Sequence, residues 1–445
     1  MRLRIVVVAL LVVTGGCRYL LGLHDLPGAD ASVDAYLPDA GPCQELGVSC
    51  AGPDTLRTCT VLGEQPTDTA CSWSCSTTPD VHCTKMVPSG GGLTAADLEM
   101  SGLTPIAITT NATVDDLGSI TGIRGLGPGI VNGINFHLTN NVAVYNFDSL
   151  TIGPAITLTM QGTHPIAFAV RGDLEIDSAT LDATGGCNNN QTGGPGGGVG
   201  GNPGQPGGGG IAGGGGGTQI GGESSGGGGG SYGASGGTGG KSATTMAPAA
   251  GALVGDAEIT KLVGGGGGGG GGGPTGGAGG GGGGGFQLAA NGTITISGSI
   301  NAGGCGARHG GLGSNGGGGG GAGAGGTILI EAHDLTLAAV LAVNGGGGAA
   351  GAGGQNGSDA SVNGTRAAGG LAGAGGAGGL GGATTILVGD PGHDDNQGAG
   401  GAGGGVGRIR LNTRTGTVMM MPGATLSPTL TDTGTTSTTG QAATQ

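Results

Sequence analysis

Glycine constrains this chain more than any other feature of its sequence. It accounts for 121 of the 445 residues and is concentrated in tracts that span about residues 185–285, 303–326 and 345–382. Glycine brings no side chain to a core and destabilises a regular element by about 0.5–1 kcal/mol relative to alanine. The tracts are therefore either disordered or held by backbone hydrogen bonds in a form that only glycine permits.

The tracts differ from two familiar glycine-rich structures. Glycine does not occupy strictly every third position together with proline, which excludes a collagen triple helix. The tracts are also too long and too apolar to be simple flexible linkers. We expect extended, polyproline-II-like segments that pack closely because no Cβ intervenes, each hydrogen-bonded to the next. Unstructured glycine loops remain the alternative.

Short stretches of alternating apolar and polar residues flank the tracts. A strand-turn-strand unit ending in Gly-Gly spans residues 167–186, with copies at 292–304 and 326–345 and degenerate copies at 384–388 and 408–411. A repeated unit with no helical pattern between its copies predicts an all-β fold. We expect a β-strand region over 85–184, followed over 185–416 by a parallel β-solenoid with long glycine-rich insertions.

The N-terminus has the three parts of an export signal. Two arginines precede an apolar run at residues 5–13, which is far shorter than the ~20 residues of a membrane span, and Gly15-Gly16 then precede Cys17. This ending resembles the bacterial lipobox, so we expect residues 1–17 to be a lipoprotein signal with Cys17 lipidated. The chain would then be anchored by its lipid in the outer membrane, facing the cell surface, on an acidic tether at 18–42. Thr14 stands where that motif usually has Leu, so plain secretion stays open.

Six cysteines crowd into residues 43–84, at Cys43, Cys50, Cys59, Cys71, Cys75 and Cys83. In an exported protein this predicts a small module with three disulfides, for which fifteen pairings are possible. A zinc site using Cys71, Cys75, His82 and Cys83 is disfavoured because the other spacings are long and irregular. Cys187 and Cys305 each follow a matching Gly-Gly, which predicts a disulfide between neighbouring coils. Trp73 is expected to fill the core of the module rather than to be an exposed binding aromatic.

The charged residues exclude some partners and leave one catalytic alternative. A net charge of −14 with only 14 Lys and Arg excludes nucleic acid as a partner. Asp173, Glu175 and Asp177 alternate along one strand, with Asp182 nearby, and paired carboxylates are what polysaccharide cleavage requires. We expect these carboxylates to lie on the solvated face of a half-buried strand.

Calcium and nucleotide sites are also disfavoured. Asp390, His393, Asp394 and Asp395 offer ligands for Ca²⁺, but a solvated loop is expected there. Residues 239–242 end like a phosphate-binding loop, yet Ser235 occupies the position that requires glycine. We therefore expect no catalytic residues, no metal and no cofactor. The Thr- and Ser-rich stretch at 417–445 is expected to be disordered.

The order of these parts resembles the glycine-rich exported lipoproteins of myxobacteria. The resemblance lies in the Cys-rich module, the Leu-Thr-Ile strand at 150–152, Gly-Asp-Leu-Glu-Ile at 172–176, the poly-Gly field and Gly-Arg-Ile-Arg-Leu-Asn at 407–412. It covers most of the chain after Pro42. It implies the architecture and a location at the cell surface, but no activity and no site residues, because such proteins are functionally uncharacterised.

Together these features favour a non-enzymatic cell-surface lipoprotein with a structural or adhesive role. Its partners would be the membrane, through the lipid, and extracellular matrix, glycans or neighbouring cells. Open edge strands leave self-association open. Two alternatives remain, a polysaccharide-active β-helix enzyme and a glycan-binding module without catalysis.

Overall fold

The computed structural model describes residues 41–187, 191–208, 212–313 and 315–445. The expected signal peptide, Cys17 and nearly all of the acidic tether lie outside these residues. The chain divides into two compact units, one of residues 1–47 and 58–67 and one of residues 48–57 and 68–445. The described residues are essentially all-β, with one short 3₁₀-helix, η1 (Ala95–Leu98), and contain no helix long and apolar enough to cross a membrane.

In the smaller unit, a disulfide joins Cys43 to Cys59. The same link is supported by the backbone, because Cys43 N donates to the Glu64 carbonyl at 2.8 Å and Gly63 N donates to the Cys43 carbonyl at 2.9 Å. So short a segment buries little apolar surface, and the disulfide compensates by restricting its unfolded state.

The larger unit holds the rest of the cysteine module. The module's remaining disulfides are Cys50–Cys75 and Cys71–Cys83, so each sulfur of the alternative zinc site already belongs to a disulfide. Trp73 is 2% exposed and packs edge-on against His333 at 5.6 Å between ring centroids. Trp73 is thus a core residue. The strands over residues 47–87 are β1 (Gly47–Gly52), β2 (Thr55–Cys59) and β3 (Thr67–Ala70) in one sheet, the β4 (Cys75–Ser76) and β5 (His82–Cys83) pair, and β6 (Met86–Val87).

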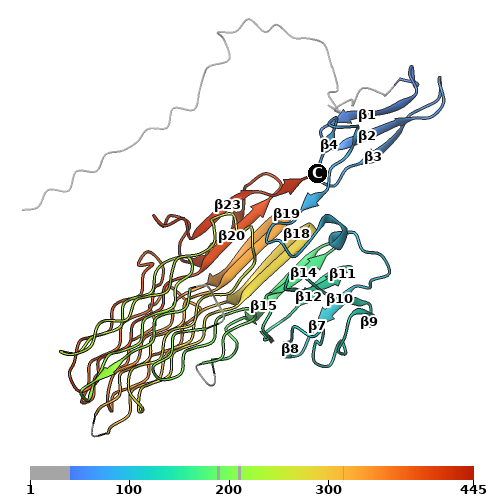
Figure 1. Ribbon diagram of the computed structural model, residues 1–445. Coiled ribbons are helices and arrows are strands. Elements are labelled where there is room, and N and C mark those ends of the chain that lie inside the picture. The colour runs from blue at the N-terminus through green and yellow to red at the C-terminus, as the bar shows by residue number, and fades with distance from the viewer. Residues whose placement is uncertain (1–40, 188–190, 209–211, 314) are drawn as a thin grey trace, which may run out of the picture. The chain divides into compact units, whose positions relative to one another are not determined.

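Most strands belong to one 15-stranded, largely parallel sheet (Figure 1). It contains three parallel ladders. The first comprises β11 (Val142–Phe147), β14 (Ile166–Val170), the start of β18 (Gly285–Asn301), the start of β19 (Thr327–Ala342), β20 (Arg408–Thr413) and β23 (Ser437–Gln441). The second comprises β7 (Ile106–Ile108), β12 (Leu150–Ile152), the start of β15 (Leu174–Asp182), the middle of β18 and β19, and β21 (Met419–Met420). The third comprises β8 (Ala112–Val114), β13 (Thr157–Met160), the ends of β15, β18 and β19, and β22 (Thr425–Ser427).

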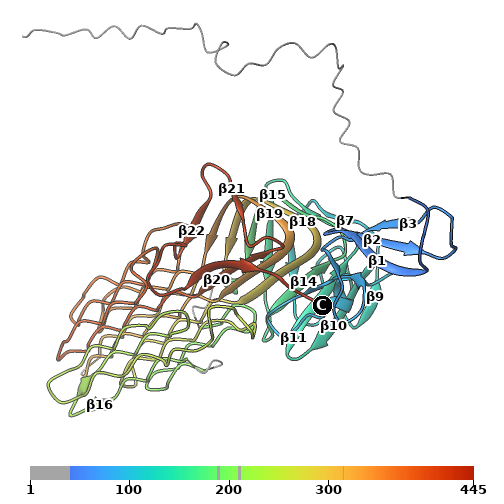
Figure 2. The ribbon, with the colours of Figure 1, turned by 90° about the horizontal axis from the view of Figure 1, so that it is seen from above.

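Because β18 and β19 each run through all three ladders, the sheet curls around a core (Figure 2). Alternate residues point inward in register, so that Ile152, Ile176 and Ile296 form one buried row. The antiparallel strands β9 (Gly129–Val131) and β10 (Ile134–Thr139) continue the first ladder beyond β11. β-Branched and aromatic side chains suit such a pleated, half-buried surface, which explains why the alternating segments form these strands.

The expectation of disorder at residues 417–445 is wrong. This stretch contains β21, β22, β23 and β24 (Ala443–Thr444), the last of which pairs with β6. Leu426 is buried in the main core, and threonine is a good strand former, so a Thr-rich composition was a poor indicator of disorder here. The degenerate copy expected at 384–388 is not a strand, and only an isolated bridge joins Ala383 to Ile386.

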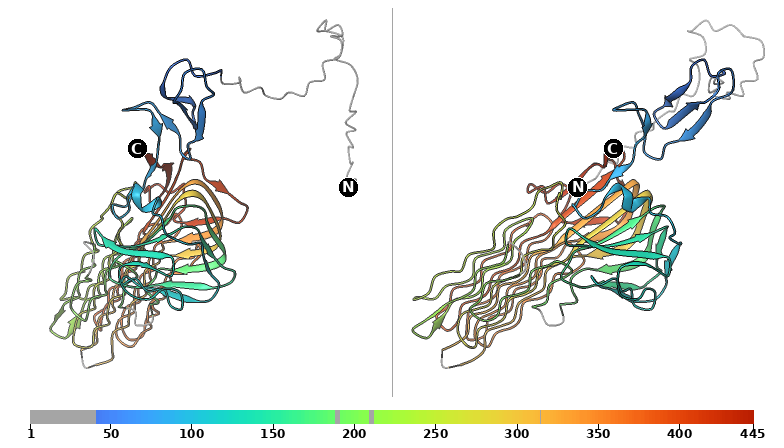
Figure 3. Two further views of the ribbon diagram at one scale, coloured as in Figure 1. Left: turned by 90° about the vertical axis from the view of Figure 1, so that its right-hand side faces the viewer. Right: turned by 45° about the vertical axis from the view of Figure 1, so that its right-hand side comes forward.

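The described residues of the glycine tracts form hydrogen-bonded segments that run side by side away from β18, β19 and β20 (Figure 3). Residues 318–326 are all buried, and every N–H in this segment donates to another segment at 2.8–3.1 Å. The segment that accepts the hydrogen bond changes with a period of three along this stretch. Residues 318, 321 and 324 donate to residues 272, 269 and 266 of one segment. Residues 319, 322 and 325 donate to 399, 402 and 405 of a second, and residues 320, 323 and 326 donate to 308, 305 and 302 of a third. Three residues per turn is the repeat of a polyproline-II helix.

The carbonyl groups complete this network. Those of residues 318–324 accept hydrogen bonds from segments 277–283, 227–230 and 346–349, so this segment is bonded to six neighbours. Residues 399–407 show the same period of three with 224–230, 387–393 and 343–349 as acceptors. We call this set of hydrogen-bonded glycine-rich segments the glycine array. The expectation of closely packed extended segments thus describes the tracts better than unstructured loops do.

Candidate functional site

The glycine segments leave the sheet where the strands of the third ladder end. The last residues of β15, β18 and β19, which are Asp182, Asn301 and Ala342, are direct neighbours in the third ladder. Short polar turns redirect the chain there: Asp182 Oδ1 accepts hydrogen bonds from Thr184 N at 2.9 Å and Oγ1 at 2.7 Å, and Asn301 Oδ1 accepts one from Gly303 N at 3.1 Å. Asp and Asn form such turns readily because their side chains bond to the backbone two residues on.

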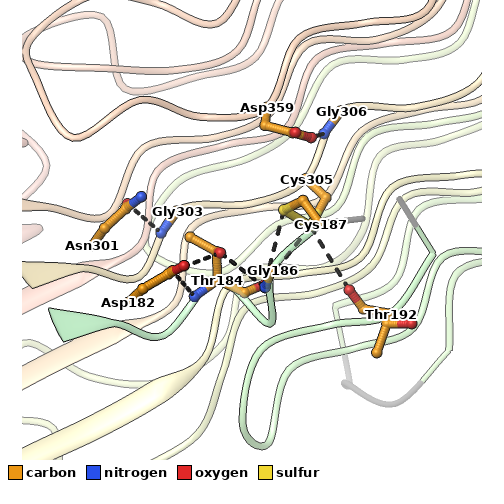
Figure 4. The surroundings of a disulfide bond; sticks show 10 residues. All are labelled: Asp182, Thr184, Gly186, Cys187, Thr192, Asn301, Gly303, Cys305, Gly306 and Asp359. Carbon is orange, nitrogen blue, oxygen red and sulfur yellow. Dashed lines mark hydrogen bonds between the residues drawn. A yellow bond between two sulfur atoms is a disulfide. The ribbon is translucent and has the colours of Figure 1, made fainter. Parts of the chain in front are cut away.

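A buried disulfide joins two of these departing segments. It links Cys187 to Cys305 (Figure 4). Their Cα atoms lie 5.4 Å apart. Cys305 is fully buried, and Cys187 is nearly so. All eight cysteines for which we expected disulfides are therefore paired, with the connectivity that the sequence left open now resolved.

A carboxylate of Asp359 lies beside this disulfide, within 4.8 Å of both sulfur atoms. It accepts a hydrogen bond from Gly306 N at 2.8 Å (Figure 4). Although Asp359 is exposed overall, partial burial of its carboxyl raises the pKa of that group above its usual value, and the bond from Gly306 acts in the opposite direction. Because the sulfur atoms of Cys187 and Cys305 are bonded to each other, only the carboxylate of Asp359 could bind a metal ion here.

The carboxylates considered for catalysis stand along one strand. Glu175 and Asp177 on β15 and Asp173 directly before it are exposed, while Leu174 and Ile176 between them point into the core. Asp173 Oδ1 accepts a hydrogen bond from Thr293 N at 2.7 Å. The neighbours of Glu175 on the adjacent strands are the threonines at 151 and 295. This is the arrangement of a solvated strand face.

The group considered for calcium is divided among separate interactions. Asp390 forms an ion pair with Arg366 at 2.7 Å. Asp394 Oδ1 accepts a hydrogen bond from Lys241 N at 2.9 Å, and Asp395 Oδ1 accepts one from Gln397 N at 2.7 Å. The carbonyl of His393 belongs to the hydrogen-bond network of the glycine array. Each of these residues thus has a structural partner of its own.

The turns at which the glycine segments reverse direction are joined into one surface. We call it the turn surface, and it comprises residues 219–224, 241–246, 273–276, 309–313 with 315–316, 352–356, 371–375 and 394–397. Thr244 Oγ1 donates to the Ile220 carbonyl at 3.0 Å, and Gln219 Nε2 donates to the Asn315 carbonyl at 3.1 Å. Backbone bonds from residue 311 to 275 and from 355 to 371 link further turns.

The turn surface displays large apolar side chains, which are rare in the glycine segments behind it. Ile220, Met246, Leu312 and Leu371 are 54%, 84%, 74% and 66% exposed. Exposed apolar side chains carried on loops of a rigid scaffold are typical of contact surfaces. Sequence analysis missed them because a single large residue within a glycine tract shows no periodicity. The available signal was that large apolar residues are rare in these tracts.

No protein family, curated protein or solved structure was found that matches this chain. We therefore infer the function from the arrangement of the residues in the structure.

Proposed function

We propose that this protein is a non-enzymatic cell-surface lipoprotein with a structural or adhesive role, in which the glycine array holds the turn surface away from the sheet for contact with matrix, glycans or neighbouring cells. The observation that carries the proposal is the combination of an extensively hydrogen-bonded array with exposed apolar side chains at its turns. A rigid support lowers the entropy lost on contact, which favours binding.

The same proposal includes a parallel β-solenoid as the architecture of the sheet. The three parallel ladders support it, since one coil would comprise one strand from each ladder, and the coils would bury each other's inward side chains. In this reading each glycine excursion is an insertion at one corner of the coil, between the third ladder and the first.

Anchoring through Cys17 is the second part of the proposal. Four disulfides in the described residues are compatible with an exported protein, because disulfides persist in oxidising compartments. The test is expression in a Gram-negative host, followed by intact mass and membrane fractionation of the parent and Cys17→Ser. The parent should carry a diacylglyceryl mass and follow the membrane, while the variant is released. A soluble, unlipidated parent would refute the anchor.

Adhesion is tested with beads coated with the purified protein. The double variant Leu312→Asp with Leu371→Asp removes two exposed apolar side chains of the turn surface, and Leu253→Asp changes an equally exposed leucine outside it. Bead attachment to cells or matrix should fall by about tenfold or more in the double variant, as for loss of anchor residues, and should be unchanged in the control. Equal attachment of all three proteins, or no attachment of the parent, would contradict the adhesive role.

A further inference from the structure

A cavity lies apart from the turn surface, where the first glycine excursion passes the ends of β8 and β13. It occupies about 500 Å³ between three stretches of chain: residues 115–117 after β8, 161–163 after β13, and 192–199 of the excursion. Because β8 and β13 are paired in parallel, their ends bring the first two stretches together. Its volume falls in the range of small-ligand sites, about 300–1,000 Å³.

Asp116 is held rigidly in the wall of this cavity. Its Oδ2 atom accepts hydrogen bonds from the backbone N and Oγ1 of Thr163, at 2.7 and 3.0 Å, and from the backbone N and Nδ1 of His164, at 3.1 and 2.7 Å. The side chain of Asp116 is 11% exposed. Burial alone would raise the pKa of Asp116, but the bonds from His164 and Thr163 outweigh it and lower that pKa. The carboxylate is therefore ionised at neutral pH.

The cavity offers hydrogen-bond acceptors that no described residue occupies. The four bonds to Asp116 all end on Oδ2, which leaves Oδ1 available. Asp115 accepts bonds from the N atoms of Leu117 and Ser119 on Oδ1 at 2.9 Å each, which leaves its Oδ2 available. Gln161 and Thr192 add neutral polar residues to the lining.

Apolar side chains stand beside these acceptors. Leu117 and Val199 line the cavity and are 63% and 51% exposed. A ligand that fits must therefore present hydrogen-bond donors on one side and C–H groups on another. The two carboxylates disfavour anions, since like charges repel strongly where water is partly excluded.

We propose that this cavity binds one ring of a neutral sugar within a glycan. The sugar hydroxyls would donate to Asp116 and Asp115, and the C–H face of the ring would pack on Leu117 and Val199. Binding without cleavage is the expected outcome, because an aspartate that stays ionised has no proton to give to a leaving group. This inference does not depend on the turn surface.

The test is binding of the full exported chain to a panel of neutral, amino-sugar and uronic-acid glycans, with released products assayed in parallel. Leu117→Glu adds an anion at the cavity, and Leu126→Glu changes an exposed leucine in the same loop region outside its lining. Neutral glycans should bind the parent and Leu126→Glu, and binding should fall at least tenfold in Leu117→Glu. Uronic-acid glycans should not bind, and no product should appear.

Three results would overturn the proposal: no neutral glycan binds the parent, Leu117→Glu binds as the parent does, or only amine-bearing ligands bind. Thermal melting of each variant confirms that the fold is kept. The two proposals are tested separately, because Leu117→Glu should lose neutral-glycan binding and keep bead attachment to a protein matrix, whereas Leu312→Asp with Leu371→Asp should lose most of that attachment.

Discussion

The carbonyl oxygen of Val343 lies directly against the Cα of Gly325, in the space that a Cβ would fill at that position. The same relationship is repeated through residues 318–326, where added Cβ atoms would overlap carbonyl oxygens of neighbouring segments at every glycine. The Cα–H groups therefore point at carbonyls, a weak hydrogen bond that adds to the N–H network. Glycine is required in these segments because of how closely they approach one another.

Gly325→Ala tests this close approach. The added methyl group must displace the backbone at Val343, so the free energy of unfolding should fall by about 1–3 kcal/mol, as for overpacking of a core. Gly125→Ala is the control, because nothing lies within 4 Å of a Cβ there. Urea unfolding followed by circular dichroism measures both. Equal midpoints for the two variants would show that residue 325 is not closely packed.

The Cys187–Cys305 disulfide should contribute strongly to stability. It closes a loop with a sequence separation of 118 residues, for which the chain-entropy model gives about 4–5 kcal/mol. The double variant Cys187→Ser with Cys305→Ser should lower the unfolding midpoint accordingly. The matched control, Cys43→Ser with Cys59→Ser, opens a separation of only 16 residues in the smaller unit and should leave the main transition in place. The reverse order of effects would contradict this account.

Glu331 is a fully buried carboxylate whose partners are neutral. It accepts hydrogen bonds from Ser89 Oγ at 2.7 Å, Gln287 Nε2 at 2.8 Å and Asn412 Nδ2 at 3.0 Å. Glu331→Ala leaves these buried donors unsatisfied and should cost about 3 kcal/mol of unfolding free energy. Glu175→Ala, on the exposed side of β15, should change it by less than about 0.5 kcal/mol. Thermal unfolding checks both, and similar melting temperatures would argue against the buried network.

Asp97 should make stability depend on acid pH. Burial alone would raise the pKa of Asp97, but hydrogen bonds from His137 and Thr94 lower it below the ordinary value. The stability from this group is therefore complete above the unfolded pKa of about 4 and is lost as pH falls through the lower folded pKa. Asp97→Asn should lose less stability than the parent between pH 5 and pH 2 in urea titrations. A steeper loss in the variant would refute this assignment.

Much of the strand pattern could be predicted from the sequence. Alternation at 167–176 and 292–300 marked β14, β15 and β18, because inward and outward residues differ clearly there. The pairing of Cys187 with Cys305 followed from their matching positions after Gly-Gly. Alternation could not predict the strands at 419–427, since exposed methionines in β21 show no inward face.

The turn surface and the cavity beside Asp116 could not be predicted in the same way. Leu312 and Leu371 are far apart in the chain from Ile220, and only the antiparallel path of the glycine segments brings their turns to one surface. The cavity depends likewise on the parallel pairing of β8 with β13, which is a property of register and not of local sequence.

Hydrogen–deuterium exchange of the amides in residues 318–326 and 399–407 tests the central claim most directly, which is that the glycine array is an ordered, hydrogen-bonded structure. Every N–H in both segments donates to a neighbouring segment, so these amides should be protected as strongly as those of β18 and β19. Exchange at the rate of an unstructured glycine loop, while β18 and β19 stay protected, would contradict the claim and remove the rigid support of the turn surface.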